Sequence, residues 1–114
     1  WESQGCARFA LHIIDLYKHL CYEEKEFVIS KQLLRCGTSI GANAKESSFA
    51  QSKADFIAKL FISLKEAGET EYWLELLYES GYIDEERFDV LYSKNKALIR
   101  IITSIIKTTK NNNC

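Results

Sequence analysis

The sequence predicts an all-α protein, an antiparallel up-down four-helix bundle formed by a single domain over residues 1–114. Four segments carry apolar residues at alternating intervals of three and four, which gathers them on one face of a helix. No segment alternates apolar and polar residues as a strand does, and proline is absent from the chain. Short connections between segments of this length place neighbouring helices antiparallel.

The first helix is expected from about Gly5 to Tyr22. Its apolar residues form two adjacent stripes, Cys6, Phe9, Ile13, Leu16 and Leu20 and, beside them, Ala7, Ala10, Ile14, Tyr17 and Cys21. More than half of the helix circumference is therefore apolar, which is wider than one pair of neighbouring helices covers. This surplus favours assembly with further chains.

The second helix is expected over residues 28–49, although its middle resembles a turn in composition. Each glycine inside a helix costs about 1 kcal/mol relative to alanine, so another factor must stabilise the segment. Its small residues recur on one stripe, Gly37, Gly41, Ala44 and Ser48. We therefore predict a close-packing face that another helix backbone approaches.

The third and fourth helices have clear start and stop signals. Ser52 is a good N-cap with Asp55 at the third helical position, and Gly81 ends the third helix. Asp84 caps the fourth helix, which runs to about Thr108. The predicted core stripes are Ile57, Leu60, Leu64, Ala67, Glu71, Leu74 and Tyr78, then Phe88, Leu91, Asn95, Leu98, Ile102 and Ile105.

Three polar residues, Asn43, Glu71 and Asn95, occupy positions where apolar side chains are expected. Glu71 and Asn95 lie in the stripes above, and Asn43 continues the spacing of Ile29, Leu33, Cys36 and Ile40 in the second helix. A buried amide needs hydrogen bonds, and a buried carboxylate needs a cation or several donors. The three residues are expected to form a polar layer that fixes helix register, or to lie at the rim of the bundle. The alternative is a ligand pocket built from them.

Charge is unevenly distributed although the net charge is only -1. From Glu66 to Asp89 nine acidic residues accompany Arg87 alone, whereas from Val90 onward there are five basic residues and no acidic one. Four of those bases follow helical spacing and form a basic stripe, Lys96, Arg100, Lys107 and Lys110. Such a stripe can follow a phosphate backbone without reading sequence.

Bases on the polar side of the second helix, Lys31, Arg35 and Lys45, would extend a nucleic-acid-binding surface if assembly brought them near the basic stripe. The competing interpretation of the stripe is a solvated face, or one paired with the acidic third helix of its own or a neighbouring subunit. Aromatic residues between the bases would favour single strands, but the fourth helix has only Phe88 and Tyr92, both near its start.

Catalytic and metal-binding patterns are absent from the sequence. No Glu-x-x-His pair or P-loop occurs, and the one run with Gly-x-Ser-x-Gly spacing, Gly37-Thr-Ser-Ile-Gly41, lies inside a periodic helix rather than in a loop. We therefore expect neither an enzyme nor a cofactor or metal. The four widely spaced cysteines are expected to be reduced core thiols. No apolar run is long enough to span a membrane, which favours the cytoplasm. The chain starts at Trp1 and lacks methionine, so its true start is expected upstream.

Several motifs carry a family resemblance. They are Gln32-Leu-Leu-Arg-Cys-Gly-Thr-Ser-Ile-Gly-Ala-Asn43, Asp55-Phe-Ile57, Leu64-Lys-Glu-Ala67 and Glu69-Thr-Glu-Tyr-Trp-Leu74. The chain closely resembles the four-helix-bundle proteins encoded within bacterial 23S ribosomal RNA intervening sequences, whose relatives include the accessory variability determinant of diversity-generating retroelements. The resemblance implies a homopentamer with nucleic acid and, in the retroelement relatives, a reverse transcriptase as partners.

Two functions follow as hypotheses. The first is a non-enzymatic homo-oligomer that binds RNA or a ribonucleoprotein through basic surface on the fourth and second helices. The second is an oligomeric protein-interaction scaffold that binds no nucleic acid. The salt dependence of RNA affinity distinguishes them, because only the first depends on counterion release.

Overall fold

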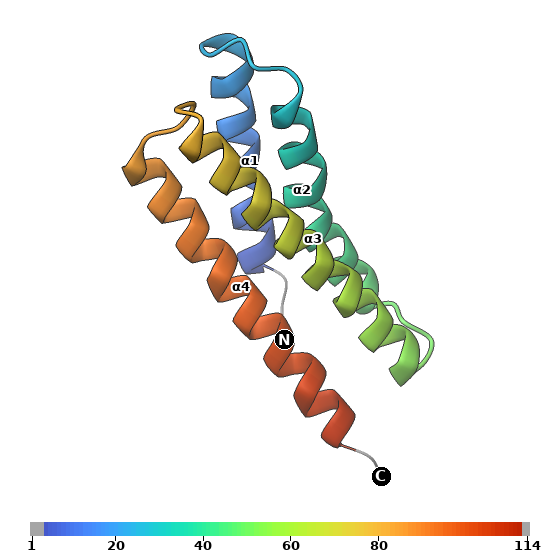
Figure 1. Cartoon of the computed structure of the whole chain (residues 1–114). Coiled ribbons are helices and arrows are strands. Elements are labelled where there is room, and N and C mark those ends of the chain that lie inside the picture. Colours follow the sequence, from blue (N-terminus) through green and yellow to red (C-terminus); the bar gives the residue numbers. More distant parts are fainter. Residues whose placement is uncertain (1–3, 113–114) are drawn as a thin grey trace.

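The computed structural model describes residues 4–112 and shows four helices in this part of the chain (Figure 1). They are α1 (Gln4–Tyr22), α2 (Ile29–Ser47), α3 (Lys53–Glu79) and α4 (Glu85–Asn111). The predicted all-α up-down bundle is confirmed. The start of α1 agrees within one residue, whereas α2 ends two residues before its predicted end and α4 extends three residues further than predicted.

Each helix packs mainly on its neighbours in sequence. α2 contacts α1 and α3, α4 packs on α3, and the contact between α1 and α4 is much smaller. α2 and α4 lie diagonally across the bundle, and their backbones do not approach each other closely. α3 and α4 have 27 residues each and α1 has 19, so the start of α3 and the end of α4 extend past the start of α1 (Figure 1).

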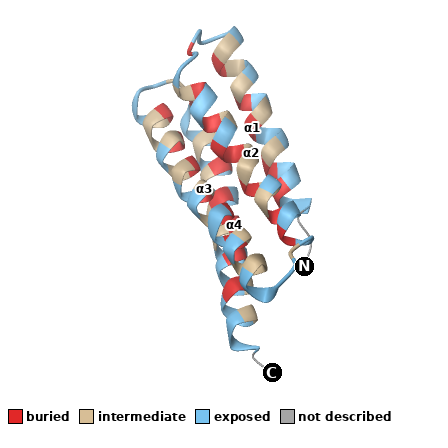
Figure 2. Ribbon diagram, turned by 90° about the vertical axis from the view of Figure 1, so that its right-hand side faces the viewer, coloured by how far each residue is buried: buried red, intermediate tan, exposed pale blue. Residues whose placement is uncertain are grey.

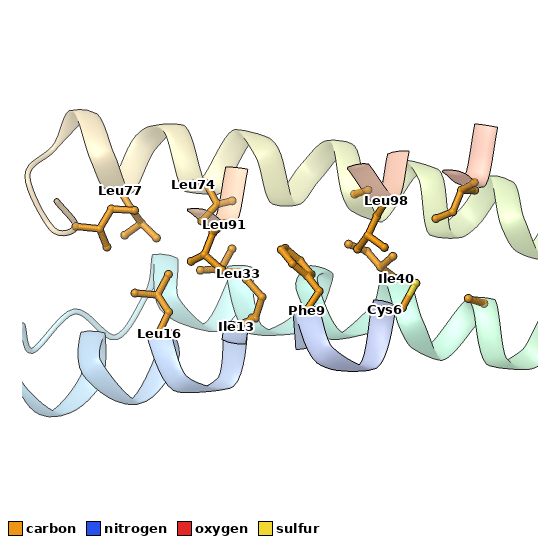
Figure 3. Close-up of a cluster of buried hydrophobic side chains, with 14 of the residues drawn as sticks. Cys6, Phe9, Ile13, Leu16, Leu33, Ile40, Leu74, Leu77, Leu91 and Leu98 are labelled. Carbon is orange, nitrogen blue, oxygen red and sulfur yellow. The ribbon is translucent and has the colours of Figure 1, made fainter. Parts of the chain in front are cut away.

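The core runs along the bundle axis between the helices (Figures 2 and 3). In α1 the first predicted stripe is buried completely, whereas the second stripe is exposed or half-buried. In α3 the buried face is rotated from the prediction, since Ser63, Thr70 and Leu77 are buried while Leu64, Glu71 and Tyr78 are half-buried.

The hydroxyls of α3 make this rotation possible, because each finds an acceptor inside the bundle. Ser63 Oγ donates to the Ile40 carbonyl at 2.8 Å. Thr70 Oγ1 donates to the Glu66 carbonyl of its own helix at 2.8 Å. A hydroxyl bonded in this way is inexpensive to bury, so the apolar pattern alone misplaces the face.

The predicted caps are present. Ser52 Oγ accepts the Asp55 amide at 3.0 Å, and Asp84 Oδ1 accepts the Arg87 amide at 2.8 Å. Gly81 follows α3 with a φ of 86°, the left-handed conformation that glycine adopts most readily. These signals define both ends of the connection between α3 and α4.

The close-packing face of α2 is filled by α1 of the same chain. A Cβ added to Gly37 would lie 2.9 Å from both γ-carbons of Ile13, and one added to Gly41 would lie 3.3 Å from Cys6 Cβ. Ala44 is buried and Ser48 is exposed. The two glycines therefore serve packing within the bundle.

Candidate nucleic-acid interface

The basic stripe of α4 lies along its seam with α3. Lys96 Nζ is 2.8 Å from Glu71 Oε1, and Lys110 Nζ lies 4.9 Å from the centre of the Phe61 ring. Arg100 and Lys107 are exposed between them and make no ion pair within residues 4–112. Two of the four predicted bases are thus fully available to an anion, and Lys110 is held only by an exposed aromatic contact.

Lys96 is committed to the bundle by the same seam. Hydrogen bonds from Lys96 and then from Tyr92 hold the pKa of Glu71 below its usual range. Tyr92 also donates to Glu75 Oε2 at 2.9 Å, and the two carboxylates raise the pKa of the Tyr92 hydroxyl. This end of the stripe is therefore an intramolecular polar cluster.

Within one chain, the bases of α2 do not extend the stripe. Arg35 binds α3 through Glu66, at 3.0 Å, and through Glu69, so its guanidinium is already paired. The indole of Trp73 also donates to Glu69 at 3.0 Å, which fixes that carboxylate. Lys31 and Lys45 are exposed. Because α2 and α4 are diagonal neighbours whose backbones do not approach closely, the chain alone does not join these residues and the stripe into one face.

Charge divides the 53 Å bundle into two halves. We place the boundary between the halves at the level where Gly37 of α2 packs on Ile13 of α1. On the other two helices the boundary lies where the side chain of Asn95 donates to the Ala67 carbonyl at 2.9 Å. The half containing the α2–α3 connection, here called the basic half, holds nine lysines and arginines and three acids. The remaining described residues, the acidic half, hold six bases and twelve acids.

The basic half comprises residues 4–12, 38–66 and 96–112. Its bases are Arg8, Lys45, Lys53, Lys59, Lys65, Lys96, Arg100, Lys107 and Lys110. Its formal charge is thus +6 against -6 for the acidic half. The near-zero net charge of the chain hides this polarity, which favours an anion at one end of the bundle only.

The three polar stripe residues have separate partners. Asn95 is fully buried and donates to Ala67, Glu71 lies half-buried at the rim with Lys96, and Asn43 donates to the Ser39 carbonyl of its own helix at 2.9 Å. No hydrogen bond joins Asn43, Glu71 and Asn95 within the described chain. The rim position fits Glu71, and the single shared layer does not form.

A cleft of about 890 Å³ opens between the end of α1 and the start of α4. It is lined by His12, His19, Arg87 and several acids, and none of the three polar stripe residues contributes to it. His19 Nδ1 is 2.7 Å from Glu23. The cleft lies in the acidic half, so its charge disfavours a polyanion.

Chemistry-bearing side chains are not gathered elsewhere in the described residues. No group of three or more His, Cys, Asp or Glu residues is placed to hold a metal ion there. Cys6, Cys21 and Cys36 are free thiols, and burial raises the pKa of Cys36 to about 11. Cys114 lies outside the described residues. None of the four described helices is long and apolar enough to cross a membrane.

Phe61 is not among the residues that the sequence predicts for the site, because only aromatic residues of the fourth helix itself are considered beside the basic stripe. In the bundle, α3 brings this exposed ring to the basic stripe. Lys65 also lies on α3 in the basic half and is exposed. The signal available in the sequence was the predicted antiparallel pairing of the third and fourth helices, which sets the start of one beside the end of the other.

Comparisons with known proteins give a consistent picture. The family described as 23S rRNA-intervening sequence protein matches residues 3–104. A crystal structure of a protein with unknown function from the S23 ribosomal protein family of Bacteroides thetaiotaomicron is similar, with a TM-score of 0.91 and 52% sequence identity. The match covers 92% of this chain and 97% of that chain. No curated protein matches.

Proposed function

The chain belongs to the 23S rRNA-intervening sequence protein family, and we propose that it is a non-enzymatic, self-associating bundle that binds RNA or a ribonucleoprotein through its basic half. The observation that carries this proposal is the separation of charge along the bundle, with Arg100 and Lys107 exposed and unpaired within the described chain. Cations in such a position displace condensed counterions from a phosphate backbone and gain affinity from their release.

The proposed surface differs from the one that the sequence suggests. Lys96 and Arg35 are excluded because acids of α3 already neutralise them. Lys31 is excluded because it lies in the acidic half, and Lys45 because it lies on α2, whereas Lys65 lies exposed on α3 in the basic half. The surface is therefore formed by the end of α4 and the start of α3.

A protein-interaction scaffold is the second candidate function. Large apolar side chains are exposed in the acidic half, among them Tyr22, Phe27 and Val28 around the α1–α2 connection. Apolar residues beside acidic ones suit a basic protein partner, and a reverse transcriptase is such a partner by analogy with the retroelement relatives.

The first function is tested by charge reversal. The double variant R100E/K107E should lose most of its affinity for single-stranded RNA, and the slope of log K against log salt should fall by about 1.4 because two phosphate contacts are removed. Binding is measured by fluorescence anisotropy over a salt series. Circular dichroism confirms that the bundle is intact.

The matched control is K18E/K94E, which makes the same charge change at two exposed, unpaired lysines of the acidic half. It should retain most of the affinity and nearly the wild-type salt slope. Equal losses in both double variants would show that only net charge matters. Absence of RNA binding by the wild-type chain at low salt would contradict the proposed function and favour the scaffold.

A further inference from the structure

We propose that the α3–α4 seam of the basic half selects single-stranded RNA, with one base stacked on the ring of Phe61. This inference rests on the proposed function and adds to it the strandedness of the ligand and the residue that recognises it. Its elements are an exposed ring, a row of cations beside the ring, and the absence of acids between them.

Phe61 is placed where a base can reach it. It lies in the first half of α3, and 41% of its surface is exposed. A phenylalanine carries no polar group that would explain this exposure. Phe49 is more exposed, but it lies in the connection between α2 and α3, and within the described chain its ring has no contact with a base of the stripe as Phe61 has with Lys110.

Cations flank the ring along the seam. Lys110 Nζ lies over Phe61, and Lys107 and Arg100 follow on the same face of α4 at intervals of three and seven residues. From Arg100 to Lys110 the stripe spans roughly 15 Å at 1.5 Å per residue. No acid of α4 interrupts it, because no Asp or Glu follows Asp89 in the chain. A phosphate backbone can follow this row.

α3 is open at Gly68, on the side of Phe61 that leads toward Lys96. Gly68 lies two helical turns from Phe61 on α3, and a Cβ built there would meet no atom within 4 Å. Glu71, one turn further, is neutralised by Lys96, so it does not repel a strand that enters from this side. On this side of Phe61, α3 therefore presents no side chain at position 68 and no unpaired carboxylate at position 71.

Stacking on Phe61 requires an unpaired base. In a duplex the base faces are covered by their neighbours, so a duplex gains only the phosphate contacts, whereas a single strand gains both. Lys110 does not block this arrangement. Its ammonium is exposed and its contact with the ring is weak, so it can leave the ring for a phosphate when a base arrives.

The experiment compares Phe61→Leu, which keeps an apolar side chain without a ring face, with Phe61→Tyr, which keeps the ring. The probes are a labelled oligouridine of about 16 nucleotides and an RNA duplex of the same length. Phe61→Leu should weaken binding of the single strand about tenfold and leave binding of the duplex unchanged. Phe61→Tyr should bind both probes as the wild type does.

Tyr72→Leu is the matched control, because Tyr72 is a 53% exposed aromatic residue of α3 in the acidic half. It should bind both probes like the wild type. Light scattering on each variant tests the competing role of Phe61 as a contact between chains. A Phe61→Leu variant whose assembly mass changes would assign the ring to assembly and overturn the inference.

The other outcomes are also decisive. Equal weakening of single-strand and duplex binding, or no weakening of either, removes stacking on Phe61 while the charge-reversal result still supports the proposed function. Failure of Phe61→Tyr to bind the single strand has the same meaning. If the wild-type chain binds neither probe at low salt, the proposed function itself fails and the inference fails with it.

Discussion

The buried carboxylate of Glu26 holds the start of α2. It accepts the backbone amides of Val28 at 2.9 Å, Ile29 at 2.9 Å and Ser30 at 2.6 Å, and the Ser30 hydroxyl donates to the Glu26 carbonyl at 2.8 Å. Burial by itself raises the pKa of Glu26, but the donated hydrogen bonds outweigh it and hold the pKa below its usual range. The carboxylate therefore satisfies the free amides at the start of α2, as an N-cap side chain does.

Replacing Glu26 by glutamine should destabilise the bundle by about 1.5–3 kcal/mol at pH 7, the range for hydrogen bonds to a charged group. Because the folded pKa lies below the unfolded value, the stabilisation is present above the unfolded pKa and is lost as the pH falls through the folded one. Denaturant unfolding at pH 7 and near pH 3 measures the difference, which should shrink in acid.

Glu79→Gln is the control for this prediction, since Glu79 is exposed and has no bonded partner within the described chain. Its effect should stay within about 0.5 kcal/mol at both pH values. A Glu26→Gln penalty that is equal at pH 7 and pH 3 would mean that shape, and not charge, supports the start of α2.

Local signals were predictable at the residue scale and tertiary ones were not. Ser52 and Asp84 are caps because each binds an amide three residues on, which sequence spacing reveals. In the sequence, Glu26 is indistinguishable from the other charged residues of the connection between the first two helices. Its burial depends on the turn of the backbone at Lys25, where φ is 55°, and the sequence does not show that turn. Phe61 likewise becomes part of a site only when α3 meets α4.

At the scale of elements, the α1–α2 contact depends on Gly37. Gly37→Ala should destabilise the bundle by about 1–3 kcal/mol although alanine favours helix, because the new Cβ would lie 2.9 Å from both γ-carbons of the buried Ile13. These atoms lie next to the branch point of a packed side chain and have little freedom to move. Thermal and denaturant unfolding measure the loss.

Gly68→Ala is the opposite case in the same fold. A Cβ there meets nothing within 4 Å, so helix propensity decides and the variant should gain about 0.5–1 kcal/mol. The double variant Ile13→Ala/Gly37→Ala should lose less free energy of unfolding than the sum of the losses of the two single variants. Equal effects of alanine at positions 37 and 68 would contradict close packing at Gly37.

The faces of the elements could be predicted only where the apolar residues are unambiguous. α1 buries its first predicted stripe without exception. In α3 the sequence offers Leu64 and Tyr78 as core residues, but the bundle buries Ser63, Thr70 and Leu77 on the adjacent line. The hydrogen bonds that make those hydroxyls acceptable lie partly in another helix, and no apolar pattern contains that information.

For the whole molecule, topology converts a difference along the sequence into a difference between two ends. The acidic end of α3 and the acidic start of α4 meet at one connection, and the basic end of α4 lies beside the lysines that begin α3. The sequence contained both the charge runs and the up-down order. It did not reveal that Lys96 and Arg35 are neutralised, because that depends on which side chains share a seam.

Self-association is the prediction that the whole molecule supports. α1 packs extensively on α2 alone, and its outer face carries Leu11 with 66% of its surface exposed. Halves of opposite charge also favour contacts between the basic half of one copy and the acidic half of the next, a head-to-tail arrangement that closes into a ring when the rotation allows it. We therefore expect an oligomer, with a pentamer as the number that the family resemblance implies.

Leu11→Glu should lower the mass in solution toward the 13.2 kDa of one chain, because burying a carboxylate against an apolar surface is costly. Ala42→Glu, an exposed position on α2, is the matched control and should leave the mass unchanged. Light scattering at micromolar concentration measures both, with circular dichroism to show that the helices persist.

High salt should weaken the wild-type oligomer if charge contributes, since salt screens exposed pairs. A wild-type monomer at that concentration contradicts assembly outright, and an unchanged Leu11→Glu oligomer moves the interface away from α1.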